Sequence, residues 1–192
     1  MPETLGLDNR GMNDVSPWVA RWAHLWPAGS RILDVACGSG RHVRYLASLG
    51  MVVTALDRDE AALAGLHGVA AQCIAADIED RPWPLPGSTF DGVLVTNYLH
   101  RPLMPVLLAS VAEGGMLVYE TFSRGQALMG RPRRLEFLLE AAELLRMTAG
   151  LHVVAYEDGF EQGPAEGPHG GSYVQRIVAA RTSEACPRYP LT

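Results

Sequence analysis

Glycines and an acidic residue mark the point where the first apolar run of the sequence ends. Asp34 lies within that run, and the segment Ala36–Gly40 follows it directly. Gly38 and Gly40 have no Cβ, so the backbone can turn sharply and a ligand can come close to it. A helix that starts at Arg41 would direct its free N–H groups toward such a ligand. The segment therefore predicts binding of a small ligand with a polar or anionic end.

Two further carboxylates follow apolar runs later in the chain. Asp57 ends the second run, where an acidic side chain can accept hydrogen bonds from ribose hydroxyls. Its alternative role is a helix N-cap, for which Asp59 is better placed. Asp77 follows the third run and can accept from an exocyclic amine, while Ile78 can pack on a purine face. The alternative for Asp77 is an ordinary turn aspartate.

Polar side chains also follow the fourth apolar run. Asn97, Tyr98 and His100 come directly after it, at an edge where open parallel sheets bind their ligands. Histidine exchanges protons near neutral pH, so His100 is the candidate general base, and Tyr98 would orient an acceptor. Glu120 is a second acid near the same edge. The alternative is that Asn97 only begins a turn and that His100 only caps a helix.

Four arginines lie in the segment Ser123–Arg134 of an otherwise acidic chain; they are Arg124, Arg131, Arg133 and Arg134. Guanidinium groups bind carboxylates and phosphates in bidentate fashion. The segment follows a strand, so it would lie over the pocket in which a substrate binds. One hypothesis is an anionic acceptor, and the alternative is a solvated loop.

Strands and helices alternate along most of the chain. Strands are expected at 31–36, 51–56, 69–75, 90–96, 116–121, 151–157 and 173–181. Helices are expected from 17, at 41–49 and 60–66, from 102, and at 134–147. This order predicts an α/β, Rossmann-like three-layer sandwich with a mostly parallel sheet. The last two strands have no helix between them, so an antiparallel pair is expected there.

The whole chain is expected to form one domain, 1–192, with a loose arm at 1–15 and a loose tail at 183–192. Three tryptophans, Trp18, Trp22 and Trp26, lie on one face of the first helix, where packing is the favoured role. The alternative, implied only by a family resemblance of the chain, is that Trp18 and Arg21 close over the bound cofactor.

Composition excludes several classes of protein. The 192 residues are 48% apolar and 19% charged, which is typical of a globular domain. A net charge of −5 gives no general attraction for nucleic acid. Three widely spaced cysteines and six histidines without ligand spacing predict neither a disulfide framework nor a metal site. No apolar run is long enough for a membrane span, and no signal peptide is expected, so a cytoplasmic location is predicted.

Together these segments resemble the motifs of the class I S-adenosylmethionine-dependent methyltransferases, with Ala36 where many members have glycine. The resemblance implies a seven-stranded sheet with an antiparallel last strand, S-adenosylmethionine as cofactor and S-adenosylhomocysteine as product. It also implies a set of cofactor-binding residues, which are Asp34, Ala36, Cys37, Gly38, Gly40, Asp57, Arg58, Asp77, Ile78 and Asn97. Asp34 would order the loop, and Tyr98 would lie with Asn97 where donor meets acceptor.

Within that family the chain is most similar to small stand-alone bacterial enzymes of the tellurite-resistance and small-molecule type. The expected partner is a small-molecule acceptor, and the oligomeric state stays open. Two alternatives are a methyltransferase acting on RNA or protein and a non-catalytic S-adenosylmethionine-binding protein. An NAD-binding fold is disfavoured because Val43 stands where a G-x-G-x-x-G motif needs its third glycine.

Overall fold

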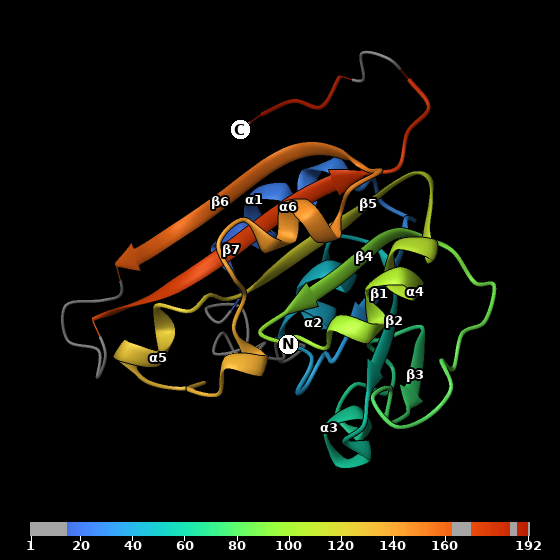
Figure 1. Ribbon diagram of the computed structural model, residues 1–192. Coiled ribbons are helices and arrows are strands. Elements are labelled where there is room, and N and C mark those ends of the chain that lie inside the picture. Colours follow the sequence, from blue (N-terminus) through green and yellow to red (C-terminus); the bar gives the residue numbers. More distant parts are fainter. Residues whose placement is uncertain (1–14, 163–169, 185–187, 192) are drawn as a thin grey trace, which may run out of the picture.

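The structure is a computed structural model that describes residues 15–162, 170–184 and 188–191. Its seven strands form one sheet in the order β3-β2-β1-β4-β5-β7-β6 (Figure 1). The strands are β1 Arg31–Val35, β2 Val52–Asp57, β3 Gln72–Ala75, β4 Phe90–Thr96, β5 Val111–Phe122, β6 His152–Gln162 and β7 Gly171–Ala180. Strands β1 to β5 are parallel to one another, and β7 runs antiparallel to both β5 and β6. The predicted fold class is confirmed.

Helices cover both faces of the sheet, which gives three layers (Figure 1). They are α1 Pro17–Trp22, α2 Arg41–Ser48, α3 Glu60–Ala64, α4 Met104–Ala109, α5 Gln126–Met129 and α6 Glu143–Met147, with 3-10 turns η1 Ala23–Leu25, η2 Arg101–Leu103 and η3 Leu135–Phe137. Helices α1, α2 and α3 pack on one face, and α4 and α6 pack on the other. None of the helices within the described ranges is long and apolar enough to cross a membrane.

Strand β1 shows why two cores form. The side chain of Ile32 packs with the α1 and α2 layer, whereas Leu33 and Val35 pack with the α4 and α6 layer. All three are fully buried, as expected for a central parallel strand that is covered on both faces.

Helix α1 and the turn η1 that follows it carry the three tryptophans on their buried side. Ser16 caps α1 by accepting hydrogen bonds from the backbone N–H groups of Trp18 and Val19. Trp18, Trp22 and Trp26 are each less than 5% exposed and belong to one core. The packing interpretation is therefore confirmed.

Both ends of the chain were expected to be loose. Residues 1–14 of the expected arm lie outside the described residues. Within the described part of the tail most residues are exposed, but Tyr189 is packed: its ring lies 6.0 Å from that of His152. The carbonyl oxygen of Pro190 also lies 3.3 Å from Nε2 of His24. The apolar ring of Tyr189 against the core explains the difference.

The predicted helix at 134–147 is wrong in its first two thirds. Only η3 and α6 form there, and Ala142 between them has a φ of +55°. Side chains from elsewhere compete for its backbone groups: Arg101 donates to the carbonyl oxygens of Glu136 and Leu138, at 2.7 and 2.9 Å. Gln175, fully buried on β7, accepts from the N–H of Leu144 at 3.1 Å. These long-range hydrogen bonds replace the helical ones.

Candidate functional site

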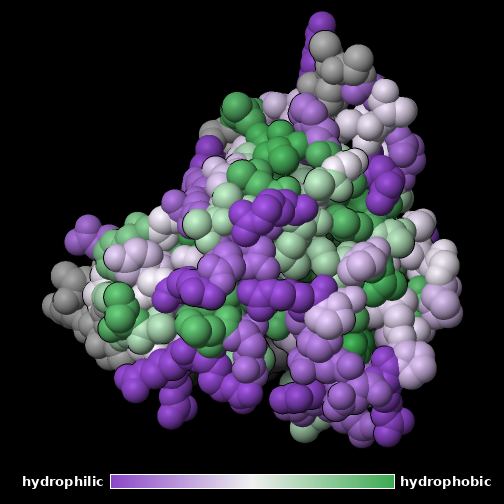
Figure 2. Space-filling model, viewed as in Figure 1, coloured by the Kyte–Doolittle hydropathy of each residue, from purple (hydrophilic) through white to green (hydrophobic). Residues whose placement is uncertain are grey.

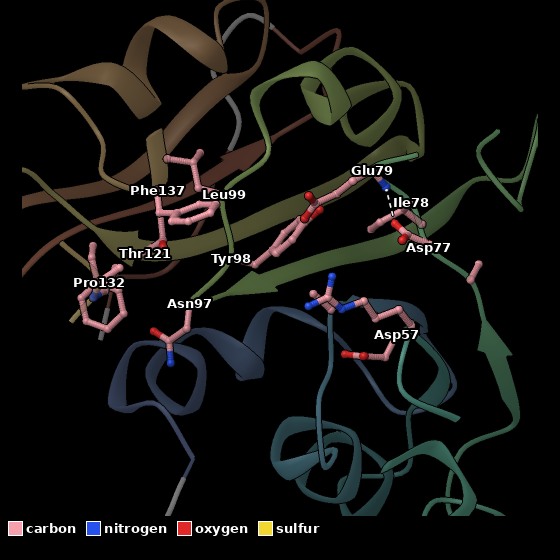
Figure 3. Close-up of a pocket in the computed structure, with 14 residues that line it drawn as sticks. Asp57, Asp77, Ile78, Glu79, Asn97, Tyr98, Leu99, Thr121, Pro132 and Phe137 are labelled. Atoms are coloured by element: carbon pink, nitrogen blue, oxygen red, sulfur yellow. Dashed lines mark hydrogen bonds between the residues drawn. The ribbon is translucent and has the colours of Figure 1, made fainter. Parts of the chain in front are cut away.

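A cavity of about 420 Å³ opens at the carboxyl ends of β1, β2, β3, β4 and β5 (Figure 3). Its lining comes from six stretches of chain: Ala36, Asp57 with Arg58, Ala76 to Glu79, Asn97 to Leu99, Thr121 with Phe122, and Pro132 with Phe137. Figure 3 shows Asp57 and Asp77 toward one end of this cavity and Thr121, Pro132 and Phe137 toward the other. The cavity therefore has an acidic end and an apolar end.

The glycine segment after β1 turns through left-handed backbone. Ala36, Gly38 and Gly40 have φ values of +54°, +54° and +78°. A Cβ on Gly38 would meet nothing within 4 Å, whereas a Cβ on Gly40 would lie 2.3 Å from the side chain of Leu66. Gly38 thus leaves open space for a ligand, while Gly40 is required by packing, a role that the ligand-based prediction did not include.

Asp57 at the end of β2 organises this segment. Its Oδ2 accepts from the backbone N–H of Gly38 at 2.7 Å, and its Oδ1 accepts from that of Asp59 at 2.9 Å. Each carboxylate oxygen has a second lone pair, and the side chain lines the cavity. Asp59, not Asp57, caps α3. Asp57 is therefore free to accept two hydroxyl groups from a ligand.

Asp77 and Ile78 follow β3 at the same end of the cavity. Oδ1 of Asp77 accepts from the N–H of Glu79 at 3.1 Å, which holds the carboxylate in the turn. Ile78 is 8% exposed and packs with the core beneath. Arg58 is the basic residue of the lining. The turn role of Asp77 and a ligand role coexist, because Oδ2 has no part in the turn.

Asp34 lies below the glycine segment, outside the cavity lining. The carboxyl is 1% exposed, and neither oxygen has a hydrogen-bond partner among the described residues. Burial raises the pKa of Asp34 to about 8. The positive charge of Arg41 opposes this shift, and the negative charge of Asp57 adds to it. Cys37 turns toward the core, with Sγ 3.7 Å from the carbonyl oxygen of Gly38. Neither residue lines the cavity.

The turn after β4 forms the middle of the cavity. Asn97 has a φ of +55°, and its N–H donates to the carbonyl oxygen of Glu120 at 2.9 Å. The hydroxyl of Tyr119 donates to the carbonyl oxygen of Tyr98 at 2.9 Å, which fixes the next residue of the turn. Burial raises the pKa of Tyr98, and the charge of Glu79 adds to that effect. Tyr98 is therefore held as a neutral phenol.

His100 does not line the cavity. Its Nδ1 lies 3.9 Å from the carboxylate of Glu79, which does line it. Figure 3 shows the side chain of Tyr98 directed toward that same carboxylate. Sequence reasoning missed Glu79, because it follows Asp77 and Ile78 in a polar stretch with no distinctive spacing. Glu120 also lies outside the lining and pairs with Arg176 at 2.6 Å.

The apolar end of the cavity is bounded by the segment between β5 and α6. Gln126, 4% exposed, donates to the carbonyl oxygen of Arg131 and accepts from the N–H of Tyr173, each at 3.1 Å. Arg101 forms a two-pronged ion pair with Glu143, at 2.6 and 3.0 Å. The buried side chain of Gln126 thus holds the segment near one end, and the half-exposed ion pair of Arg101 holds it at the other.

None of the four arginines of this segment lines the cavity. Arg124 pairs with Glu140, and Arg134 pairs with Glu136. Arg131 and Arg133 are exposed on either side of Pro132, which is the lining residue. Figure 2 shows hydrophilic and hydrophobic side chains mixed over the region of α5. The arginines therefore lie at the rim rather than inside.

The structure brings together six of the ten residues expected to bind the cofactor; they are Ala36, Asp57, Arg58, Asp77, Ile78 and Asn97. Tyr98, expected beside the acceptor, lines the cavity with them. The remaining four expected residues, Asp34, Cys37, Gly38 and Gly40, are not among the lining residues.

Comparison with known proteins identifies this arrangement. The family described as a methyltransferase domain matches residues 32–113, which span the glycine segment and β1 to the start of β5. This match agrees with the resemblance of the chain to the class I S-adenosylmethionine-dependent methyltransferases. S-adenosylmethionine is the cofactor of this family. The residues present fit it: open space beside Gly38 and free lone pairs on Asp57 suit its amino-acid and ribose parts.

Relatives of known name match part of the chain. A ubiquinone biosynthesis O-methyltransferase from Xanthomonas axonopodis pv. citri is 35% identical over 116 residues, covering 55% of this chain and 48% of that protein. The protein of that name from Azotobacter vinelandii is 30% identical over 126 residues, covering 59% of this chain and 54% of its own. The chain thus spans about half the length of these relatives.

Solved structures match the fold over most of the chain. TehB from Haemophilus influenzae superposes with a TM-score of 0.73 at 17% identity, covering 90% of this chain and 65% of that one. The N-methyltransferase NodS from Bradyrhizobium japonicum superposes with a TM-score of 0.66 at 18% identity, covering 90% of this chain and 98% of that one. Identities this low show a shared fold.

Proposed function

We propose that this protein transfers the methyl group of S-adenosylmethionine to a small acceptor with a largely apolar body. One observation carries the proposal: a single cavity runs from Asp57 and Asp77, past Asn97, to Thr121 and Phe137. A donor held by the two carboxylates would direct its reactive end toward the apolar end. The relatives named as O-methyltransferases of ubiquinone biosynthesis support an acceptor of this kind.

S-adenosylmethionine supplies, when bound, a methyl group already activated by its positively charged sulfur. The protein then has to align the acceptor atom with the methyl carbon and to exclude water. Asp57 would orient the ribose, and Asn97 with Tyr98 would fix the middle of the cavity. Phe122, Pro132 and Phe137 would hold the body of the acceptor.

We further propose that the acceptor atom loses its proton to solvent water, without a protein base. The described side chains at the apolar end are Thr121, Phe122, Pro132 and Phe137, none of which exchanges protons near neutrality. Nucleophiles that ionise easily, such as thiols and phenols, need no such base. The cavity lining gives no support to His100 as the base. Replacing His100 by alanine should leave turnover within about threefold of the parent, and a loss of two orders of magnitude would restore it to the mechanism.

An anionic group on the acceptor is the finer hypothesis that the rim arginines support. Arg131 and Arg133 flank Pro132 at the outer end of the cavity, where they could bind a carboxylate that protrudes from it. Replacing both by alanine should raise KM for carboxylated acceptors and leave KM for neutral analogues unchanged. An equal rise in KM for carboxylated and neutral acceptors would contradict carboxylate binding by these two arginines.

The first experiment is titration of the protein with S-adenosylmethionine and S-adenosylhomocysteine by calorimetry. Absence of binding to both would overturn the proposal. Labelled donor would then be incubated with panels of phenols, thiols, carboxylic acids, tRNA and protein extracts. Labelling confined to tRNA or protein would favour the macromolecular alternative, and binding without labelling of any pool would favour a non-catalytic binding protein.

Phe137→Ala separates the acceptor end of the cavity from the donor end. It should raise acceptor KM by about tenfold, because the aromatic contact with the acceptor is lost, and leave donor affinity unchanged. Phe160→Ala is the matched control, since Phe160 is similarly exposed but lies on β6, away from the lining.

A further inference from the structure

His42 joins three segments of the chain that are far apart in sequence. It is the second residue of α2 and is 2% exposed. Its Nε2 accepts from the backbone N–H of Ser16 at 3.2 Å, and its Nδ1 lies 3.3 Å from Oγ1 of Thr96. One imidazole thus contacts the N-cap of α1, the first turn of α2 and the end of β4.

The partners determine which nitrogen carries the proton. The backbone N–H of Ser16 can only donate, so Nε2 must be unprotonated. A neutral ring then carries its proton on Nδ1 and donates it to the hydroxyl oxygen of Thr96. Burial, aided by the charge of Arg41, lowers the pKa of His42 to about 4, so the neutral ring persists at physiological pH.

Two of the three contacted segments adjoin residues that line the cavity. The helix that carries His42 begins directly after the glycine segment, whose Gly40 is its N-cap. Thr96 precedes Asn97, the cavity residue with a φ of +55°. Ser16 caps α1 through its hydroxyl, so the bond to its N–H fixes where that helix begins.

We propose that His42 is a positioning residue of the donor site, which holds the glycine segment and the Asn97 turn at a fixed spacing. The inference rests on the proposed function, because the site that it positions is the S-adenosylmethionine site. Without the imidazole, the end of β4 and the start of α2 lose their side-chain link. Donor and acceptor would then be aligned less well, since a displacement of about 1 Å can cost two orders of magnitude in rate.

His42→Phe removes both hydrogen bonds while filling the same volume. It should raise the Kd for S-adenosylmethionine by about tenfold, the equivalent of about one ordinary hydrogen bond, because part of the loss of the two bonds falls on the stability of the fold. His42→Asn places an amide where Nδ1 lies and can keep the link to Thr96, so it should recover most of the donor affinity. Thr96→Val should weaken binding as well, and combining it with His42→Phe should add little. His67→Asn, an exposed histidine, is the control.

A purely structural role would lower the melting temperature without changing donor affinity measured on the folded protein. Donor affinity of His42→Phe within twofold of the parent would overturn the proposal. If that variant does not fold, Thr96→Val and the ¹⁵N spectrum of the parent decide. A ring protonated on Nε2 would overturn the assignment, and one protonated on Nδ1 supports it. Failure of the parent to bind S-adenosylmethionine would instead count against the proposed function.

Discussion

The carboxylate of Asp57 holds the backbone N–H of Gly38 at 2.7 Å. This bond links the end of β2 to the turn after β1, so the residue expected to orient the ribose also shapes the loop expected to receive the amino-acid end of the donor. Donor binding should therefore depend on Asp57 in two ways, through direct acceptance of hydroxyls and through the loop.

Asp57→Ala should raise the Kd for S-adenosylmethionine by at least about 30-fold, since hydrogen bonds to a charged acceptor are each worth about 1.5–3 kcal/mol. Asp57→Asn keeps one acceptor oxygen, so its Kd should lie between those of the parent and of Asp57→Ala. Calorimetry with S-adenosylmethionine and S-adenosylhomocysteine measures both. The control is Glu60→Gln on the exposed start of α3. Equal affinities of parent and alanine variant would remove Asp57 from the donor site.

The two glycines of the loop should respond differently to alanine. Gly40→Ala should destabilise the fold by about 2 kcal/mol, because its Cβ would collide with Leu66 and its φ is +78°. Gly38→Ala should cost about 1 kcal/mol for its φ alone but should weaken donor binding strongly, because its Cβ projects into open space. Urea unfolding and calorimetry separate the two effects.

A double-mutant cycle tests the collision directly. Leu66→Ala shortens the side chain that Gly40→Ala would strike, so the combined variant should lose less stability than the two single variants predict. Additive losses would show that backbone strain, not Leu66, accounts for the effect of Gly40→Ala.

Much of the fold could be predicted from sequence, because apolar periodicity and the acidic residues after strands are local signals. The different roles of Gly38 and Gly40 could not be predicted, since the packing role of Gly40 depends on where Leu66 lies. Nor could Glu79, which faces Tyr98 only because the turns after β3 and β4 meet.

The segment 134–147 shows the same limit for secondary structure. Its leucines have helical spacing, but Arg101 and Gln175 bind its backbone groups from distant parts of the chain. Leu139 also pairs with the end of β5, where its N–H donates to Phe122. The helix propensity of this segment is weak compared with several such long-range hydrogen bonds.

Arg101 should control the mobility of this segment. Arg101→Lys keeps the charge but loses the fork that binds Glu143 and the carbonyl oxygens of Glu136 and Leu138. Amide hydrogen exchange at 136–143 should quicken by about tenfold, the equivalent of about 1.4 kcal/mol, while donor affinity stays within twofold. Arg44→Lys, which alters a single bond to Gly65, is the control. Unchanged exchange at 136–143 would contradict the role assigned to Arg101.

Two buried groups near the glycine loop should give opposite dependences of stability on pH. Burial raises the pKa of Asp34 from 3.8 to about 8, so between these values the folded state keeps a proton that the unfolded state loses, and stability falls as pH rises. Burial lowers the pKa of His42 from 6.5 to about 4, so between those values the unfolded state binds the extra proton, and stability rises with pH.

The two slopes should largely cancel between pH 4 and 6.5, and Asp34 should dominate from pH 6.5 to 8, with each slope at most about 1.4 kcal/mol per pH unit. Asp34→Asn should remove the fall above pH 6.5 and expose the rise below it. His42→Asn should do the reverse and leave a fall across the whole range. Urea unfolding of the parent and both variants at pH 5, 6.5 and 8, without donor, measures these slopes. A parent slope above pH 6.5 that persists in Asp34→Asn would mean that the Asp34 carboxyl is ionised in the folded protein.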